Sequence, residues 1–197
     1  MKKTIIVTGI PGTGKTTVCN NVVRLAEKAG VKVNVINYGT VMVGILQKHK
    51  KSMERDAMRK TDVDFQRILQ REVAETIAEK IKELEGITII DTHMSIKTPG
   101  GYLPGLPNHV LQLLKPEMLV LVEAKPEEIS SRRMRDTTRK RDEAVEEAVK
   151  EELSFSRLMA GACAVFAGAP IKIVINAEGK QEEAAKEILK SLGVNLE

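Results

Sequence analysis

The string GIPGTGKT, Gly9 to Thr16, constrains this chain more than any other feature. It fits the pattern GxxxxGK[ST], follows the apolar run Thr4 to Thr8 and precedes a helical pattern. The glycines at 9, 12 and 14 let backbone amides turn inward onto phosphate oxygens, Lys15 adds a point charge, and the Thr16 hydroxyl can reach Mg²⁺. The dipole of the helix that starts here also favours a polyanion. The sequence therefore predicts a phosphate-binding loop rather than an accidental glycine-rich turn.

Apolar runs rich in β-branched residues recur along the chain and are separated mostly by helical patterns. This order predicts an α/β fold with a five-stranded, largely parallel sheet covered by helices on both faces. The 197 residues, 42% of them hydrophobic, favour a single domain over residues 1–197. The five runs are Thr4–Thr8, Val31–Ile36, Ile87–Ile90, Met118–Val122 and Ile171–Ile175.

Cysteine usage and the N-terminal run bear on compartment and metal content. Cys19 and Cys163 show no CxxC spacing and accompany no His cluster, so we expect neither a disulfide framework nor a zinc site. The run MKKTIIVTGIPG is interrupted far short of a membrane span, so it is interpreted as a buried strand rather than a signal peptide. A cytoplasmic protein without a membrane partner fits best.

The charge balance is mildly basic, with a net charge of +4 and a pI of about 9.0, which suits anionic partners such as nucleotides or nucleic acids. The chain has two Tyr, three Phe and no Trp, so it lacks the stacking platforms that readers of single strands place beside their basic residues. We therefore expect no nucleic-acid partner.

The sequence predicts a long helix in one segment and an irregular loop in another. Thr61 to Leu84 places apolar residues on one side at three-to-four-residue steps, which predicts a long amphipathic helix whose start Thr61 and Asp64 could cap. KTPGGYLPGLP, Lys97 to Pro107, is rich in Pro and Gly, which predicts an irregular loop that shapes a ligand pocket.

Two cation-rich segments are candidates for gripping phosphate. Within a predicted insertion at residues 37–60, Arg55 and Arg59 lie four apart and would share one helix face, where they could hold a monophosphate or simply be solvated. The stretch Arg132 to Asp142 lacks apolar periodicity across TTRKR, which predicts that it forms a surface lid. Arg132, Arg139 and Arg141 could bridge phosphate oxygens bidentately, although a solvated basic loop would have the same composition.

The third apolar run ends at Asp91, where ligands bind in open α/β sheets. Asp91 could hold Mg²⁺ directly or through water, but a turn or helix cap would have the same sequence. His93 is a candidate for touching a phosphate or orienting Asp91, or it is an ordinary satisfied polar residue. No catalytic base is required where the acceptor is a phosphate, because its oxygen is already anionic near neutral pH.

The motifs GIPGTGKTT, NYGTVM, RDAMRK, DTHMSIKTPGGYLPGLP and RDTTRKRD occur in the order found in archaeal adenylate kinases. This resemblance runs over nearly the whole chain, and its middle and lid motifs are the specific ones. It implies a phosphate-loop kinase core, an AMP-binding insertion at 37–60, a short lid at 136–142, and Mg²⁺-dependent transfer from ATP to AMP, giving two ADP. Archaeal relatives include trimers and monomers, so a homo-oligomer stays open.

The resemblance also implies roles for particular residues. It assigns ATP phosphates to Gly9, Ile10, Pro11, Gly12, Thr13, Gly14, Lys15, Thr16 and Thr17. It assigns AMP to Asn37, Gly39, Arg55 and Arg59, lid cations to Arg132, Arg139 and Arg141, and Mg²⁺ to Thr16 and Asp91. The turn Asn176 to Gly179 resembles the segment that packs beside the ATP base. Unlike bacterial and eukaryotic adenylate kinases, the chain has Thr16, not Gly, directly after the loop lysine, and its predicted lid contains no cysteine.

Two alternatives stay open at this point. The acceptor could be CMP, UMP or a small metabolite such as shikimate, because base choice depends on the shape of a pocket. A non-catalytic, nucleotide-dependent RNA binder would also be basic, and its affinity would fall steeply with salt.

Overall fold

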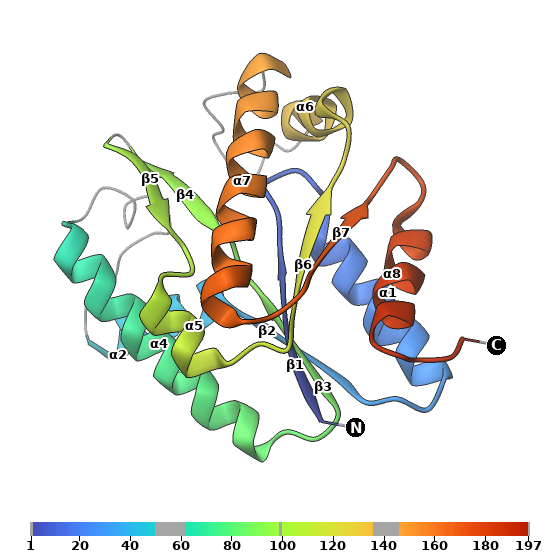
Figure 1. Ribbon diagram of the computed structural model, residues 1–197, viewed down its shortest axis with the longest axis horizontal. Coiled ribbons are helices and arrows are strands. Elements are labelled where there is room, and N and C mark those ends of the chain that lie inside the picture. The colour runs from blue at the N-terminus through green and yellow to red at the C-terminus, as the bar shows by residue number, and fades with distance from the viewer. Residues whose placement is uncertain (1, 50–61, 99, 136–145, 197) are drawn as a thin grey trace.

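The computed structural model describes residues 2–49, 62–98, 100–135 and 146–196. A five-stranded parallel sheet lies at its centre, with the strand order β2-β3-β1-β6-β7 (Figure 1). Each of the five apolar runs of the sequence overlaps one strand, so the predicted fold class is confirmed. The strands are β1 (Lys3–Thr8), β2 (Val33–Asn37), β3 (Ile87–Asp91), β6 (Met118–Glu123) and β7 (Ile171–Ile175).

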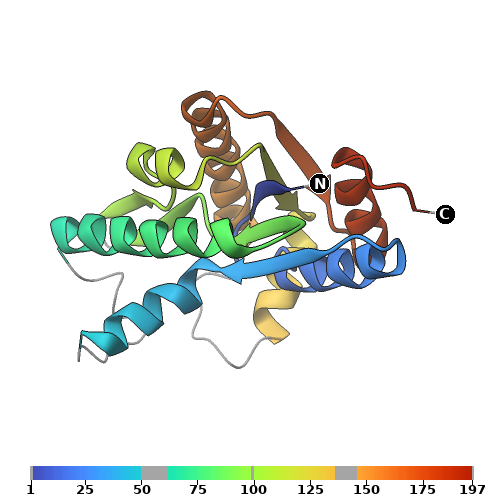
Figure 2. The same cartoon turned by 90° about the horizontal axis from the view of Figure 1, so that it is seen from below.

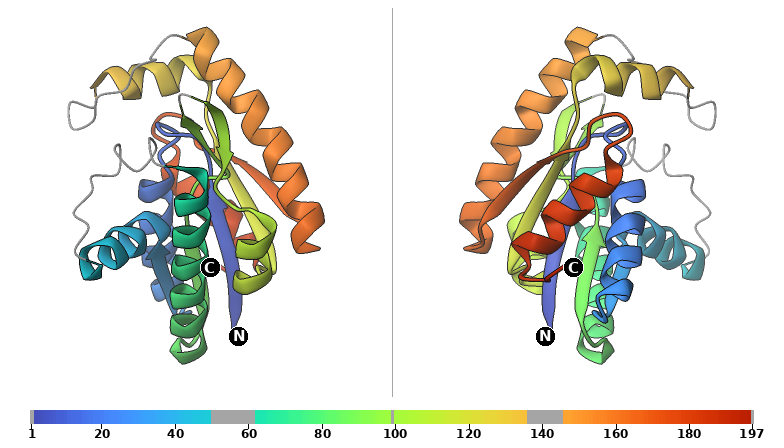
Figure 3. Two further views of the ribbon diagram at one scale, coloured as in Figure 1. Left: turned by 90° about the vertical axis from the view of Figure 1, so that its left-hand side faces the viewer. Right: turned by 90° about the vertical axis from the view of Figure 1, so that its right-hand side faces the viewer.

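Helices cover both faces of this sheet because successive strand side chains point to opposite sides. Ile5 and Val7 face the helices α1 (Lys15–Lys28) and α8 (Gln181–Ser191), which pack together on one side (Figure 3). Ile6 faces the other side, where α4 (Val63–Glu83), α5 (Asn108–Leu114) and α7 (Glu146–Ala167) form the second cover (Figures 1 and 2). The two layers fix the orientation of the strand ends, where the candidate site lies.

The predicted amphipathic helix is confirmed as α4, and its cap differs from the prediction. Asp62 is the N-cap residue, and its side chain accepts a hydrogen bond from the backbone N–H of Asp64 at 3.3 Å. Thr61 lies outside the described residues. An aspartate at the N-cap satisfies one of the amides that the first helical turn leaves unpaired, so Asp62 supplies the cap that the sequence placed one residue earlier.

The prediction of an irregular loop over Lys97 to Pro107 is wrong. Strands β4 (Ser95–Thr98) and β5 (Gly101–Pro104) form an antiparallel hairpin. Gly101 has a φ of +116°, and the Thr98 hydroxyl donates to its carbonyl oxygen at 2.8 Å, which stabilises the reversal of the chain. Both strands of a two-stranded ribbon are edges, so Pro104 is tolerated although it has no N–H to donate.

Two further helices among the described residues border the candidate site. Helix α2 (Tyr38–Lys48) follows β2 and occupies the first part of the predicted insertion. Helix α6 (Pro126–Arg135) follows β6 and lies across the top of the sheet (Figures 1 and 3). Residues 132–135, expected to begin an irregular basic stretch, are therefore the end of a helix. Among the described residues, no helix is long and apolar enough to span a membrane.

Candidate active site

Polar residues stand at the carboxyl ends of the strands, and they share one edge of the sheet. Asn37 ends β2, Asp91 ends β3 and Glu123 ends β6, while Asn176 directly follows β7. Asn37 and Asp91 are partners in register, and the Asn176 N–H donates to the Glu123 carbonyl oxygen at 2.7 Å. Strand β1 leads into the phosphate loop between them. Because the carboxyl edge of an open parallel sheet is where ligands bind, this edge is the candidate site.

Two glycines of the phosphate loop occupy positions where a side chain would collide. A Cβ on Gly9, whose φ is +149°, would lie 2.2 Å from the carbonyl oxygen of Val122. A Cβ on Gly14, whose φ is +81°, would lie 2.5 Å from Nδ2 of Asn176. Gly14 is also the N-cap residue of α1 and offers the helix amides no side-chain partner. The loop therefore combines close backbone approach with an open helix N-terminus, an arrangement suited to phosphate.

Lys15 lies inside this loop. Its side chain is buried, and Nζ donates to the Gly9 carbonyl oxygen at 2.7 Å. Nδ1 of His93 lies 3.1 Å from the same oxygen and 3.5 Å from the lysine Nζ. His93, which follows β3, therefore adjoins the lysine and the loop backbone.

Asp91 and Thr16 are the residues at this edge that could hold a divalent cation through oxygen atoms. The carboxylate of Asp91 is buried, and Oδ2 accepts a hydrogen bond from Nδ2 of Asn37 at 2.9 Å, while Thr16 is exposed at the start of α1. In the part of the chain that the structure describes, no three His, Cys, Asp or Glu residues are grouped to hold a metal. Mg²⁺ commonly uses one or two protein oxygens and completes its shell with phosphates and water, so this sparse donor set fits it.

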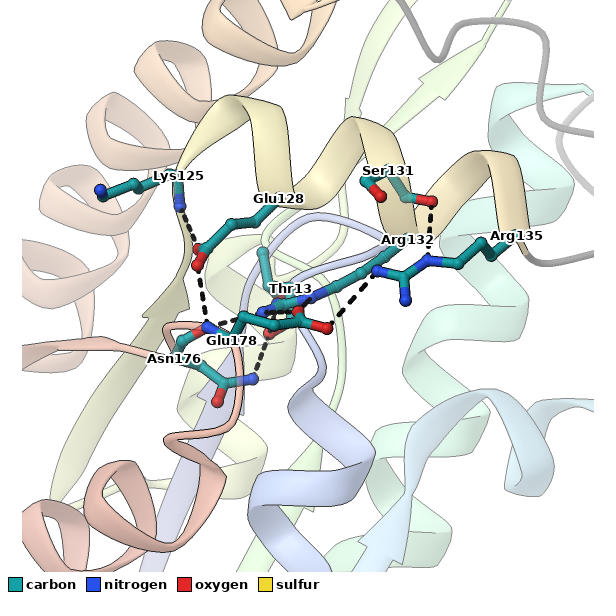
Figure 4. A network of polar contacts seen from close by, with 8 residues as sticks. All are labelled: Thr13, Lys125, Glu128, Ser131, Arg132, Arg135, Asn176 and Glu178. Atoms are coloured by element: carbon teal, nitrogen blue, oxygen red, sulfur yellow. Dashed lines mark hydrogen bonds and ion pairs between the residues drawn. The ribbon is translucent and has the colours of Figure 1, made fainter.

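The outer side of the phosphate loop is fixed by residues from α6 and from the turn after β7 (Figure 4). The Thr13 carbonyl oxygen accepts from Nδ2 of Asn176 at 2.8 Å and from Nη1 of Arg132 at 3.4 Å. Nη2 of Arg132 also donates to the Asn176 carbonyl oxygen at 3.1 Å. Arg132 thus joins the loop to the turn after β7.

A carboxylate in that turn holds two arginines of α6. Oε2 of Glu178 accepts from Nε of Arg132 at 3.0 Å, and Oε1 lies 3.5 Å from Nη2 of Arg135. The hydrogen bond and charge of Arg132 hold the pKa of the Glu178 carboxyl below its ordinary value. These residues border a pocket of about 360 Å³ beside the phosphate loop, whose lining residues are Gly14, Thr17, Arg132, Arg135, Asn176, Glu178 and Gln181.

A second arginine of α6, Arg133, also contacts the phosphate loop. Nε of Arg133 donates to the Pro11 carbonyl oxygen at 3.0 Å. Its Nη1 and Nη2 donate to the two carboxylate oxygens of Glu152, on α7, at 3.2 and 2.7 Å. The two side chains are only 4% and 13% exposed, so this is a bidentate ion pair largely removed from water.

The structure brings together several of the predicted residues. Gly9 to Thr17, Asp91 and Arg132 share the carboxyl edge of the sheet. Asn37 is also there, and its Oδ1 caps α2 by accepting from the Thr40 N–H at 2.9 Å. Gly39 lies in the first turn of that helix. Arg55, Arg59, Arg139 and Arg141 lie outside the described residues, as does the whole predicted lid at 136–142.

Three of the described residues contact the phosphate loop or Arg132 and were not singled out as candidate site residues from the sequence. They are Arg133, Asn176 and Glu178. Asn176 and Glu178 belong to a turn that the resemblance had only placed beside the ATP base. A polar residue directly after a buried strand is the signal that could have identified Asn176, as it identified Asp91. Nothing in the sequence distinguishes Arg133 from its neighbours, because its partner Glu152 is 19 residues away.

The phosphate loop, its lysine and the parallel sheet beneath them define a phosphate-loop nucleotide-binding protein. A family model described as an AAA domain matches residues 8–150. Adenylate kinase of Sulfurisphaera tokodaii is 45% identical over 189 residues, which cover 95% of this chain and 97% of the relative. Adenylate kinase of Thermoplasma acidophilum is 42% identical over 190 residues, covering 96% and 98%. The chain therefore belongs to the adenylate kinase family and is a phosphotransferase.

Solved structures resemble the chain at the level of the fold alone. The tunicamycin resistance protein of Deinococcus radiodurans aligns with a TM-score of 0.62 at 12% identity, covering 98% of each chain. Shikimate kinase from Acinetobacter baumannii, solved with shikimate, aligns with a TM-score of 0.54 at 14% identity, covering 96% of this chain and 92% of that one.

Proposed function

We propose that this adenylate kinase transfers the γ-phosphoryl group of ATP to AMP at the carboxyl edge of the sheet, with Mg²⁺ as cofactor. The observation that carries the choice of substrates is the 45% identity to an adenylate kinase over 95% of the chain. The phosphate loop on β1 and α1 supports the reaction class independently, because it pairs a buried lysine with amides that suit a triphosphate.

The donor side is assigned to the phosphate loop and the adjoining pocket. ATP phosphates would lie on Gly9 to Thr17, where the glycine geometry admits close backbone approach. The base and ribose would extend into the pocket of about 360 Å³ between α6 and the turn after β7. This direction agrees with the resemblance of Asn176 to Gly179 to a base-packing segment.

The acceptor side is assigned to Asn37, Gly39, Arg55 and Arg59. Asn37 and Gly39 stand at the junction of β2 and α2, on the opposite side of β1 from β6 and β7. Strand order therefore separates the two assigned sites across the phosphate loop, as an in-line transfer between two nucleotides requires. Arg55 and Arg59 would neutralise the acceptor phosphate.

Transfer needs no proton abstraction. An anionic oxygen of the AMP phosphate bonds to the γ-phosphorus while the bond from that phosphorus to the β,γ-bridging oxygen breaks, and its electron pair stays on the departing ADP. The residues position the phosphates and balance their charge. Lys15 would contact the transferred group, and Arg132, Arg139 and Arg141 would surround it. Thr16 and Asp91 would hold Mg²⁺, which neutralises phosphate charge when bound.

A coupled assay with ATP and a panel of acceptors tests the assignment. We expect AMP to be used best, with CMP, UMP and shikimate well behind. A clear preference for another acceptor would reassign the pocket. RNA affinity that falls steeply with salt, combined with negligible AMP-stimulated turnover, would favour the RNA-binding alternative instead.

Asp91→Asn should raise the Mg²⁺ concentration for half-maximal turnover by roughly tenfold, because it removes one carboxylate charge from the cation site. The measurement is turnover against free Mg²⁺ at saturating nucleotides. Asp64→Asn is the matched control, since that carboxylate is 78% exposed at the start of α4. An unchanged Mg²⁺ dependence in Asp91→Asn would leave the residue as a structural partner of Asn37.

Arg139→Ala and Arg141→Ala should slow turnover by roughly 10²-fold while weakening AMP binding much less, if these cations complete the site when the lid closes. Turnover at saturating substrates and AMP affinity are measured separately. An effect confined to AMP affinity would move both arginines to the acceptor side.

We propose that the protein is cytoplasmic and that it is either a trimer or a monomer. Light scattering of the purified protein distinguishes a trimer from a monomer. Among the described residues, α7 and β7 carry several of the large apolar side chains that are exposed, and in a trimer we expect a partner subunit to cover some of them: Leu158, Val165, Phe166, Ile173 and Ile175.

A further inference from the structure

One face of α6 is joined to the turn that follows β7. Glu128, Arg132 and Arg135 are spaced by four and three residues, so they line one side of the helix (Figure 4). Oε2 of Glu128 accepts from the Lys125 N–H at 3.1 Å at the start of the helix, and Oε1 accepts from the Glu178 N–H at 2.8 Å. The backbone of the turn is thereby attached to the first turn of α6.

Glu178 continues this attachment one helical turn further along. Its two carboxylate oxygens face different arginines, Arg132 at 3.0 Å and Arg135 at 3.5 Å. The side chain of Arg132 is only 16% exposed, so its charge is largely withdrawn from water and depends on a protein partner. Among the described residues, the carboxylate within ion-pairing distance of Arg132 is that of Glu178.

Arg132 transmits this restraint to the phosphate loop. It donates to the carbonyl oxygen of Thr13, and that carbonyl belongs to the peptide whose N–H is Gly14. The peptide is trans, so its C=O and N–H point in opposite directions. Holding the Thr13 oxygen toward Arg132 therefore directs the Gly14 N–H away from α6. An amide at the start of α1 is one that a phosphate would use.

We propose that Glu178 is a positioning residue of the ATP site, which acts through Arg132 to fix the Thr13–Gly14 peptide and one wall of the adjoining pocket. This inference rests on the proposed assignment of the loop and pocket to ATP. Exposed ion pairs usually contribute little, but here the arginine is mostly buried and also bonds two backbone carbonyls from separate segments. Glu178 itself needs no contact with the nucleotide.

Removal of the Glu178 carboxylate should raise the KM for ATP and leave the KM for AMP nearly unchanged. In Glu178→Ala we expect the KM for ATP to rise roughly tenfold, equivalent to about 1.4 kcal/mol, with the KM for AMP changed less than twofold. Glu178→Gln keeps an acceptor oxygen but no charge, so its KM for ATP should lie between that of the wild type and that of Glu178→Ala. Glu182→Gln is the matched control, because its carboxylate also pairs with an arginine, Arg24 at 2.6 Å, but does not line the pocket.

A double-mutant cycle separates positioning from a general structural effect. If Glu178 acts through Arg132, adding Glu178→Ala to Arg132→Ala should raise the KM for ATP no further than Arg132→Ala alone. Additive effects of the two changes, an unchanged KM for ATP in Glu178→Ala, or equal changes for ATP and AMP would each overturn the proposal.

Binding of ATP in the absence of AMP, followed by calorimetry, distinguishes this proposal from the assignment of function. A wild type that binds ATP but does not phosphorylate AMP would refute the proposed reaction. In that case the positioning role would still be supported if Glu178→Ala bound ATP more weakly than the wild type while Glu182→Gln bound it as tightly as the wild type. Equal ATP binding by all three proteins would refute the role.

Discussion

Lys15→Ala should lower turnover by about 10³-fold or more while leaving the thermal midpoint nearly unchanged. The lysine is the cation inside the phosphate loop, with Nζ 2.7 Å from the Gly9 carbonyl oxygen. A charge that stabilises the transferred group is worth most in the transition state, and a factor of 10³ corresponds to about 4 kcal/mol of barrier. The measurements are kcat with saturating ATP and AMP, and a thermal melt of each protein.

The effect of Lys15→Ala on the free energy of unfolding should be small. The lysine side chain is buried, so removing its hydrogen bond also removes a charge that is costly to bury. Lys28→Ala, at the exposed end of the same helix, is the control and should keep wild-type turnover. Near-normal turnover in Lys15→Ala would refute the role of the lysine, and a large loss of stability would show that the charge is part of the folded core.

The sheet could be predicted because its signal is local. Ile5, Ile6 and Val7 form a continuous apolar run, which is typical of a strand buried on both faces, and both faces are indeed covered. The phosphate loop was equally accessible, since its glycines, Lys15 and Thr16 are contiguous. The long helix α4 followed from its period of three to four residues, while its exact cap depended on one side-chain contact of Asp62.

The hairpin β4–β5 was missed because proline and glycine are usually read as breakers. Its formation depends on contacts from distant elements. The Tyr102 ring stacks on Phe155 of α7 with centroids 4.1 Å apart, and Nε2 of Gln70, on α4, donates to the Pro104 carbonyl oxygen at 3.0 Å. These tertiary contacts override the local preference, and no pattern within Lys97 to Pro107 announces them.

The residues that hold the phosphate loop in place could not be predicted for the same reason. Asn176 bonds to Thr13 across 163 residues, and Arg132 bonds to Glu178 across 46. Composition shows that α6 is rich in arginine, but it does not tell which arginine faces the loop, which faces α7 and which faces solvent. Arg132, chosen as a phosphate ligand, bonds in this structure to protein acceptors on the wall of the pocket, so its role toward ATP stays a prediction.

The buried pair between α6 and α7 gives the largest expected change in stability. Glu152→Gln should lower the free energy of unfolding by about 3 kcal/mol, because it removes the carboxylate charge that pairs bidentately with the largely buried Arg133 guanidinium. For a chain of this length that corresponds to roughly 6 to 12 °C in the thermal midpoint. Glu151→Gln, on the adjacent exposed position of α7, should stay within about 0.5 kcal/mol of the wild type.

Replacing both partners tests whether the cost comes from the changed balance of buried charge. Arg133→Met with Glu152→Leu should recover much of the stability lost in Glu152→Gln, because two apolar side chains leave no charge buried. The double variant still lacks the hydrogen bond from Arg133 to the Pro11 carbonyl oxygen, so ATP should bind it more weakly than the wild type. Denaturant unfolding gives the first quantity and calorimetric titration the second. A Glu152→Gln midpoint within 2 °C of the wild type, or a double variant less stable than Glu152→Gln, would mean that the pair is effectively solvated and that α6 is held to the loop by packing around Ile129 and Val149.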